Sequence, residues 1–225
     1  VGLSVVAESL KKKVNQYSSK YDAYLAGAVG LTKEEKTGLN LFKSKGKCAN
    51  CHVLDPGPNG EPPLFTDFTY DNLGVPRNPD NPFYDEPDFN PAGFSWIDLG
   101  LGGFLDSRTD YQQFAAANNG KQKVPTLRNV DKWDPMLGDQ VKAYAHNGYF
   151  KSLWQIVHFY STRDAKPQCL DDFTPVEEAL DQGCWPAPEV SVNINTKEMG
   201  NLNLTRAQED AIVAFMKTLS DGYTP

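Results

Sequence analysis

The stretch Cys48-Ala49-Asn50-Cys51-His52 places two cysteines two residues apart, with a histidine directly after the second cysteine. This spacing is the attachment signature of a c-type haem. Each thiol adds across one vinyl group of the haem, and the two bonds fix the macrocycle to the chain. The imidazole of His52 then lies beneath the iron as proximal ligand. The stretch therefore predicts one covalently bound haem c, held by Cys48, Cys51 and His52.

Two other uses of a Cys-x-x-Cys pair compete with this interpretation. Half of a zinc site would need a second cysteine pair or a His-x-x-His group to complete four ligands, and the sequence offers neither. A thioredoxin-like redox pair would sit near a βαβ pattern, which is absent, and would not be followed by histidine.

Length and charge limit the class of protein. The 225 residues suggest one domain or one and a half. The formal net charge of −7 argues against nucleic acid and anionic membrane surfaces, and leaves room for a basic redox partner protein. No apolar run approaches the roughly 18 residues of a membrane span.

The remaining cysteines and the start of the chain bear on location. No signal peptide precedes Val1, so we expect a mature, exported chain. Covalent c-type haem is assembled outside the bacterial cytoplasm, which favours the periplasm or an equivalent oxidising space. Cys169 and Cys184 flank a proline-rich, acidic segment of 14 residues, and we predict a disulfide between them. Such a bridge would contribute roughly 3 kcal/mol by the chain-entropy model; two buried free thiols are the alternative.

Helix signals occur near both ends of the chain. A helix is expected over 2–26, broken by glycines at 27 and 30. Thr32 and Glu35 form a capping-box pattern for a helix to about residue 44, in which Gly38 permits close approach of another helix. The final helix starts at Thr205, and its inner stripe includes Met216, which we interpret as core.

The middle of the chain is irregular. Residues 55–91 hold nine of the 16 prolines, so regular helix or sheet is not expected there. Their many aromatic residues predict an ordered loop that wraps the haem edge. A glycine-rich turn is expected at 100–103, a short helix over 108–117, and an irregular, bridged excursion over 161–198.

A helix over about 151–160 carries an apolar face with i, i+3, i+4, i+7 spacing. The residues of this face are Leu153, Ile156, Val157 and Tyr160. His158 lies off the face, so Tyr160 is better aimed than His158 if this helix leans on the haem. Taken alone, Tyr160 is a core tyrosine.

The order of helix, Cys-x-x-Cys-His, long loop and C-terminal helix resembles class I cytochromes c. Much of the chain resembles, more narrowly, the C-terminal haem domain of the bacterial diheme cytochrome c peroxidase family, which includes MauG-like enzymes. The stretches that carry this resemblance are 21–27, 31–35, 46–52, 64–68, 72–76, Val124-Pro125-Thr126-Leu127-Arg128-Asn129-Val130, His146-Asn147-Gly148 and 211–215.

The resemblance implies a mainly α, class I cytochrome c-like haem domain over 27–225, with long irregular loops. Residues 1–26 would be an extra N-terminal helix, the remnant of a missing first haem domain. Arg128 and His146 fall on positions near the haem, where propionate contacts are expected. The family's distal methionine lies fourteen residues after the histidine of the His-x-Gly turn, where this chain has Tyr160, as the MauG-like branch does. Tyr160 is therefore the leading distal ligand and Met199 the alternative.

The sequence differs from the family's pattern in two ways, and these differences determine which function we expect. One Cys-x-x-Cys-His motif is present where the family has two, and the family's calcium pattern is not evident, so no calcium is expected. We expect a monohaem cytochrome that relays single electrons to redox partner proteins, and we assign no catalytic residue. Peroxidase or MauG-like oxidase activity is the alternative, alone or with a separate haem subunit as one half of a split diheme enzyme.

Overall fold

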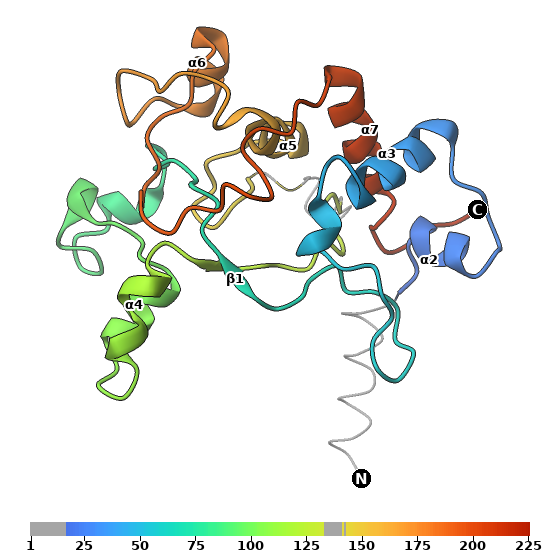
Figure 1. Cartoon of the computed structure of the whole chain (residues 1–225), viewed down its shortest axis with the longest axis horizontal. Coiled ribbons are helices and arrows are strands. Elements are labelled where there is room, and N and C mark those ends of the chain that lie inside the picture. Colours follow the sequence, from blue (N-terminus) through green and yellow to red (C-terminus); the bar gives the residue numbers. More distant parts are fainter. Residues whose placement is uncertain (1–16, 133–140, 142) are drawn as a thin grey trace.

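The computed structural model describes residues 17–132, 141 and 143–225, which form a helix-rich fold with very little sheet (Figure 1). The α-helices are α2 (Lys20–Leu25), α3 (Lys33–Lys43), α4 (Leu101–Asp106), α5 (Leu153–Thr162), α6 (Val176–Gln182) and α7 (Arg206–Lys217). The 3₁₀ turns are η1 (Cys48–Asn50), η2 (Pro82–Asp85), η3 (Gly93–Ser95), η4 (Gln112–Phe114) and η5 (Ala116–Asn118). Strands β1 (Tyr70–Asp71) and β2 (Gln122–Lys123) pair antiparallel. No helix within the described ranges is long and apolar enough to cross a membrane.

The packing of α3 against α7 forms the centre of the fold, and the sequence predicts its main features. Thr32 caps α3 and Thr205 caps α7, each through a capping box. A methyl group at Gly38 would overlap the backbone carbonyl of Ala211, so the glycine allows the two helices to touch. The predicted inner stripe of α7 is confirmed as buried core at Ile212, Phe215 and Met216, and Leu219, two residues beyond the helix, is buried as well.

The described part of the N-terminal region corrects the helix predicted over 2–26. Residues 1–16 lie outside the described part, but Tyr17 has a φ of 48° and α2 starts afresh at Lys20. Ser19 caps α2, because its hydroxyl accepts the Asp22 N–H while the Asp22 carboxylate accepts the Ser19 N–H. One continuous helix through residues 17–19 is therefore wrong, whereas the predicted break at Gly27 is confirmed by its φ of 72°.

Two other local predictions are also corrected. The glycine-rich stretch is a helix, α4, which begins after Gly100; Gly102 lies so close to the backbone of Asn119 that a side chain would overlap it. The helix predicted over 108–117 is instead a pair of short turns, η4 and η5. Figure 1 shows α4 and the turn after it projecting from the body of the protein.

The segment 161–198 contains one helix that the sequence analysis did not predict. Pro175 precedes α6, and Gly183 ends it in a left-handed conformation with φ 70°. The sulfur atoms of Cys169 and Cys184 lie 1.95 Å apart, at the bonding distance that the predicted disulfide requires. Both cysteines are buried beside Trp185, so the bridge anchors α6 to the core.

Helix α5 separates two hydrophobic clusters. Leu153 and Val157 belong to the cluster formed with α3 and α7, whereas Phe159 belongs to a second cluster with Tyr149 and Phe150. Ile156 and Tyr160 pack at the edge of this second cluster. The face of α5 between the two clusters borders the cavity described next.

Candidate haem site

A cavity of about 550 Å³ lies between α5, α7 and the Cys48–His52 stretch, and its wall is largely apolar. Its size falls within the range of cofactor sites, roughly 300 to 1,000 Å³. Apolar side chains of α5 and α7 line it, among them Val157, Ile212 and Met216. The Cys-x-x-Cys-His stretch, the β1–β2 strap and residues near 195–199 complete the wall.

The attachment motif enters this cavity through a tight turn. Lys47 takes a left-handed conformation with φ 54°, η1 follows, and the His52 N–H donates to the Cys48 carbonyl at 2.9 Å. The turn brings Cys48, Cys51 and His52 to one wall of the cavity. This is the grouping that two thioether bonds and one axial imidazole require.

The surroundings of the two cysteines bear on whether the motif holds a metal ion or a haem. Burial raises the pKa of both thiols to about 12, and for Cys51 the carboxylates of Glu198, Asp67 and Asp71 add to the effect. Cys51, Asp71 and Glu198 lie close enough together to suggest a cation site. This group does not include Cys48, so it leaves the second thiol of the motif unexplained, whereas haem c accounts for both thiols.

His52 is held in the orientation of an iron ligand. Its Nδ1 lies 2.8 Å from the carbonyl oxygen of Phe65. A carbonyl can only accept, so Nδ1 carries the hydrogen and Nε2 is left to bind iron. Burial lowers the pKa of His52, which keeps the ring neutral as a ligand must be. Phe65 is fully buried with φ 54°, so the acceptor itself is fixed by the core.

The predicted face of α5 is confirmed. Leu153, Ile156, Val157 and Tyr160 all line the cavity. His158 points away and donates from Nδ1 to the buried carboxylate of Glu209 at 3.0 Å. The same carboxylate accepts from the indole N–H of Trp154 at 2.9 Å. His158 is therefore a link between α5 and α7, and Tyr160 is the titratable side chain that this helix presents to the cavity.

Both candidates for the distal ligand border the cavity, and their backbones are joined. The N–H of Gly200 donates to the Tyr160 carbonyl at 2.6 Å, which places Met199 beside the last turn of α5. Burial raises the pKa of Tyr160, with Cys48 and Cys51 contributing, so its phenol is neutral in the absence of a metal. Met199 is also buried. The assignment of Tyr160 as distal ligand, with Met199 as alternative, stays a prediction.

Of the two residues expected near the propionates, one lines the cavity and the other does not. His146 lines the cavity, and its Nε2 lies 3.4 Å from Glu189 Oε2 and 3.9 Å from Asp98 Oδ2. Arg128 is not among the lining residues. Its guanidinium donates to both carboxylate oxygens of Asp22, at 3.0 and 2.9 Å, and to the Pro63 carbonyl at 2.7 Å. These contacts leave the propionate role of Arg128 without support.

The sequence analysis did not anticipate the polar residues at the edge of the cavity. Lys47, Lys123, Asp71 and Glu198 line it beside the attachment motif. Glu198 accepts from Asn50 and from Asn195, which also donates to Asp71. Asn50 with Glu198, and Asp71 with Asn195, are separated in the sequence by more than 120 positions, so no local signal connects them. For Lys47, its position directly before Cys48 was a sign in the sequence that it would lie near the cavity.

Haem c fits this set of residues. The cavity is apolar, the two thiols and the imidazole share one wall, and His52 is oriented by a buried carbonyl. Cys48 and Cys51 would hold the macrocycle, and His52 would ligate its iron. When bound, the group would supply reversible one-electron exchange between Fe(III) and Fe(II).

Comparison with known proteins identifies relatives that are MauG or cytochrome-c peroxidases. The chain is 30% identical over 207 residues to the methylamine utilization protein MauG of Paracoccus denitrificans, and 29% identical over 222 residues to the cytochrome-c peroxidase IdrP2 of Denitromonas iodatirespirans. The chain is a relative of the MauG-like and diheme cytochrome c peroxidases. These matches cover 91% and 96% of the chain but 47% of each relative, so the chain spans about half their length.

Solved structures agree with these relatives. The diheme peroxidase BthA of Burkholderia thailandensis superposes with a TM-score of 0.67 at 28% identity, covering 91% of this chain and 46% of that one. A MauG-like protein associated with microbial copper homeostasis shares the fold, with a TM-score of 0.57 at 20% identity. No family model matches the sequence. The comparisons support a haem-based redox role for the cavity.

Proposed function

We propose that this chain transfers single electrons through a covalently bound haem c at the Cys48–His52 motif. One observation carries the proposal. The cavity that receives Cys48, Cys51 and His52 is also lined by two residues able to act as a sixth iron ligand, Tyr160 and Met199. A haem with protein ligands on both sides suits outer-sphere electron transfer, because no position at the iron is left open for a substrate.

The surrounding residues would serve this role by limiting the structural rearrangement that accompanies oxidation and reduction of the iron. The Phe65 carbonyl fixes the ring of His52, and the Gly200–Tyr160 backbone bond fixes the wall that carries both distal candidates. Apolar side chains such as Ile212 and Met216 keep water from the cavity. A fixed, dry site loses little energy to rearrangement when the iron changes charge.

The identity of the distal ligand determines whether the reduction potential is shifted down or up. A tyrosinate is an anionic, hard ligand that favours Fe(III), whereas the soft thioether of methionine favours Fe(II). We expect ligation by Tyr160 and a potential below that of a His/Met cytochrome.

The deciding experiment is the electronic and EPR spectrum of the oxidised holoprotein. Tyr160→Phe should change the ferric spectrum, and Met199→Leu should leave it as in the wild type. The near-infrared methionine–iron charge-transfer band, or a low-spin spectrum unchanged in Tyr160→Phe, would refute tyrosine ligation. Failure of the haem to be reduced and reoxidised by one-electron reagents would refute electron transfer itself.

A second candidate, peroxidase or MauG-like oxidase activity, is favoured by the names of the relatives. In that case one axial position would be labile, or a separate haem domain would handle peroxide. Hydrogen peroxide should then alter the spectrum and be consumed with a reduced donor. A six-coordinate haem indifferent to peroxide would exclude the version in which this chain acts alone, and the mass of the native particle would reveal a second haem subunit.

The same proposal includes an exported location and redox partner proteins. Haem c attachment and the Cys169–Cys184 bridge both suit an oxidising compartment such as the periplasm. Measurement of haem content and free thiols in protein recovered from the periplasm tests this directly.

A further inference from the structure

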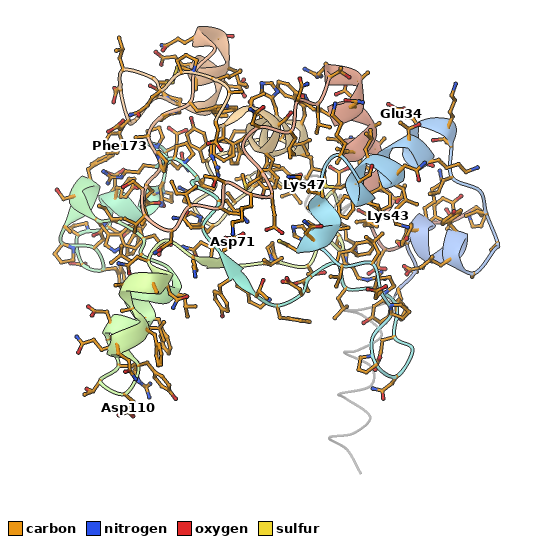
Figure 2. The ribbon with its side chains drawn as sticks, viewed as in Figure 1. Glu34, Lys43, Lys47, Asp71, Asp110 and Phe173 are labelled. Carbon is orange, nitrogen blue, oxygen red and sulfur yellow. A yellow bond between two sulfur atoms is a disulfide. The ribbon has the colours of Figure 1, made fainter. Side chains whose placement is uncertain are left out.

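Four lysines gather on the surface beside the haem motif. Lys43 ends α3, Lys45 and Lys47 lie in the turn that leads to Cys48, and Lys197 lies against the same turn. All four are exposed. The Lys47 ammonium donates to the Lys197 carbonyl at 2.7 Å, which joins the two segments. Figure 2 labels Lys43 and Lys47 close to one another near this turn. We call these four residues the lysine patch.

The charges of the lysine patch are not neutralised by direct ion pairs. Lys45 donates to the Asn203 carbonyl at 2.6 Å and to the side-chain amide of Gln208 at 3.0 Å, both neutral acceptors. Within the described part of the chain, the recorded ion pairs involve other cations, such as Lys20 with Glu35 and Lys217 with Asp131. The lysine patch therefore presents positive charge to solvent.

Three carboxylates lie nearby: Glu198 and Asp71 at the edge of the cavity, and Asp67, whose N–H donates to the Cys51 carbonyl. Glu198 accepts from Asn50 at 3.1 Å and from Asn195 at 2.7 Å, and Asp71 accepts from Asn195. Four cations against three carboxylates still leave a net positive charge at this surface. This local sign is opposite to the net charge of the whole chain, which is −7.

The lysine patch also coincides with the opening toward the haem. Lys47 is exposed, lines the cavity and directly precedes Cys48. Cys48 and Cys51 are both partly exposed. Because Lys47 is exposed, lines the cavity and adjoins Cys48, the edge of a haem held there would lie next to the lysine patch.

We propose that the lysine patch is the docking surface for an acidic redox protein, which exchanges one electron with the haem at the Cys48–Cys51 edge. The inference rests on the proposed electron-transfer function. In each encounter one electron leaves the reduced centre and one is gained by the oxidised centre, and no bond forms or breaks. Attraction at the lysine patch raises the encounter rate and orients the partner toward the edge.

The direction in which the oxidation rate changes with ionic strength shows whether the lysine patch or the net charge of the chain governs the encounter. Hexacyanoferrate(III) is a small anionic oxidant that probes the local field. We expect its rate of oxidation of the reduced holoprotein to fall as ionic strength rises from about 0.01 M to about 0.5 M, where charges are screened. A protein that acted through its net negative charge would show a rate that rises with salt. The cationic oxidant tris(phenanthroline)cobalt(III) should show the weaker or opposite trend.

Charge-reversal variants locate the effect. The double variant Lys43→Glu/Lys197→Glu should lower the hexacyanoferrate rate about tenfold at low ionic strength. Lys33→Glu is the control, because it introduces glutamate at the other end of α3, roughly 15 Å from Lys43; its effect should be small. Binding of poly-glutamate, followed by calorimetry, supplies a readout independent of electron transfer and should be lost in the double variant alone.

The outcomes distinguish the two levels of the proposal. A rate that rises with salt in the wild type, or poly-glutamate binding that survives in the double variant, would overturn the docking surface while leaving electron transfer intact. Electron transfer itself would fail if neither oxidant reoxidised the reduced haem at any ionic strength, whatever the lysines. A rate that falls with salt, together with selective loss in the double variant, supports both.

Discussion

Replacement of Arg128 tests whether this residue serves the haem or the fold. The side chains of Arg128 and Asp22 are 5% and 11% exposed, and they form a bidentate pair supported by the Pro63 carbonyl. Arg128→Ala would leave the Asp22 carboxylate buried without its cation. Loss of one partner from a buried pair costs about 3 to 5 kcal/mol. We expect the free energy of unfolding to fall by about that amount, while the haem spectrum and reduction potential stay close to the wild type.

The assay is urea unfolding of the holoprotein followed by far-UV circular dichroism, beside a redox titration of each variant. Asp22→Asn is the matched change at the other partner, and it should destabilise the fold through the same contact. A double-mutant cycle of the two positions should give a coupling of about 1 to 3 kcal/mol. The reasoning is refuted if Arg128→Ala leaves stability unchanged but shifts the reduction potential, and Asp22→Asn does neither. That result would restore the propionate contact.

Acid should weaken the same contact. Burial raises the pKa of Asp22, but hydrogen bonds from Arg128 and Ser19 outweigh this effect, and the pKa of the carboxyl lies below its ordinary value of 3.8. A carboxyl with a lowered folded-state pKa stabilises the protein above its unfolded value and loses this effect as pH falls through the folded value. The unfolding free energy should therefore decline below pH 3.8 in the wild type, and less steeply in Asp22→Asn.

Two further changes test the packing. Gly38→Ala places a methyl group against the Ala211 carbonyl and should lower the free energy of unfolding by about 1 to 3 kcal/mol, measured by urea unfolding; Gly30→Ala, where the added group meets open space, is the control. Replacement of both Cys169 and Cys184 by serine should lower the midpoint of unfolding by the equivalent of roughly 3 kcal/mol, and equal midpoints with and without a reductant in the wild type would contradict the bridge.

The sequence predicted best those features that depend on local spacing. Thr32 and Thr205 predict the starts of their helices, because a capping residue and its partner are only three positions apart in the sequence. The face of α5 follows from helical periodicity, so Tyr160 could be assigned to the cavity and His158 excluded from it. Cys48 and His52 meet at the cavity for the same reason, since the motif is one tight turn.

Features that depend on distant partners could not be predicted in this way. Arg128 finds its acceptor 106 positions away at Asp22, so nothing around residue 128 shows that its donors are already used. Gly102 looks like a turn residue, yet it lies in α4 because the backbone of Asn119 leaves no room for a side chain. The helix α6 is different, since Pro175 and Gly183 bracket it and were available as signals.

The wall beside Tyr160 shows why two distal ligands remain candidates on structural grounds. Gly200 has φ 101°, and the carboxylate of Asp164 occupies the place where a side chain would lie. Its N–H donates to Tyr160 and its carbonyl accepts from the Asp164 N–H at 2.7 Å, so residue 199 is held against the end of α5 whichever ligand binds. Met199 would therefore stay beside Tyr160 at the cavity wall even if Tyr160 were the ligand. The choice between them then depends on charge: an anionic tyrosinate stabilises Fe(III), whereas a thioether stabilises Fe(II). We therefore expect the spectra of the two oxidation states to show which of the two side chains is bound.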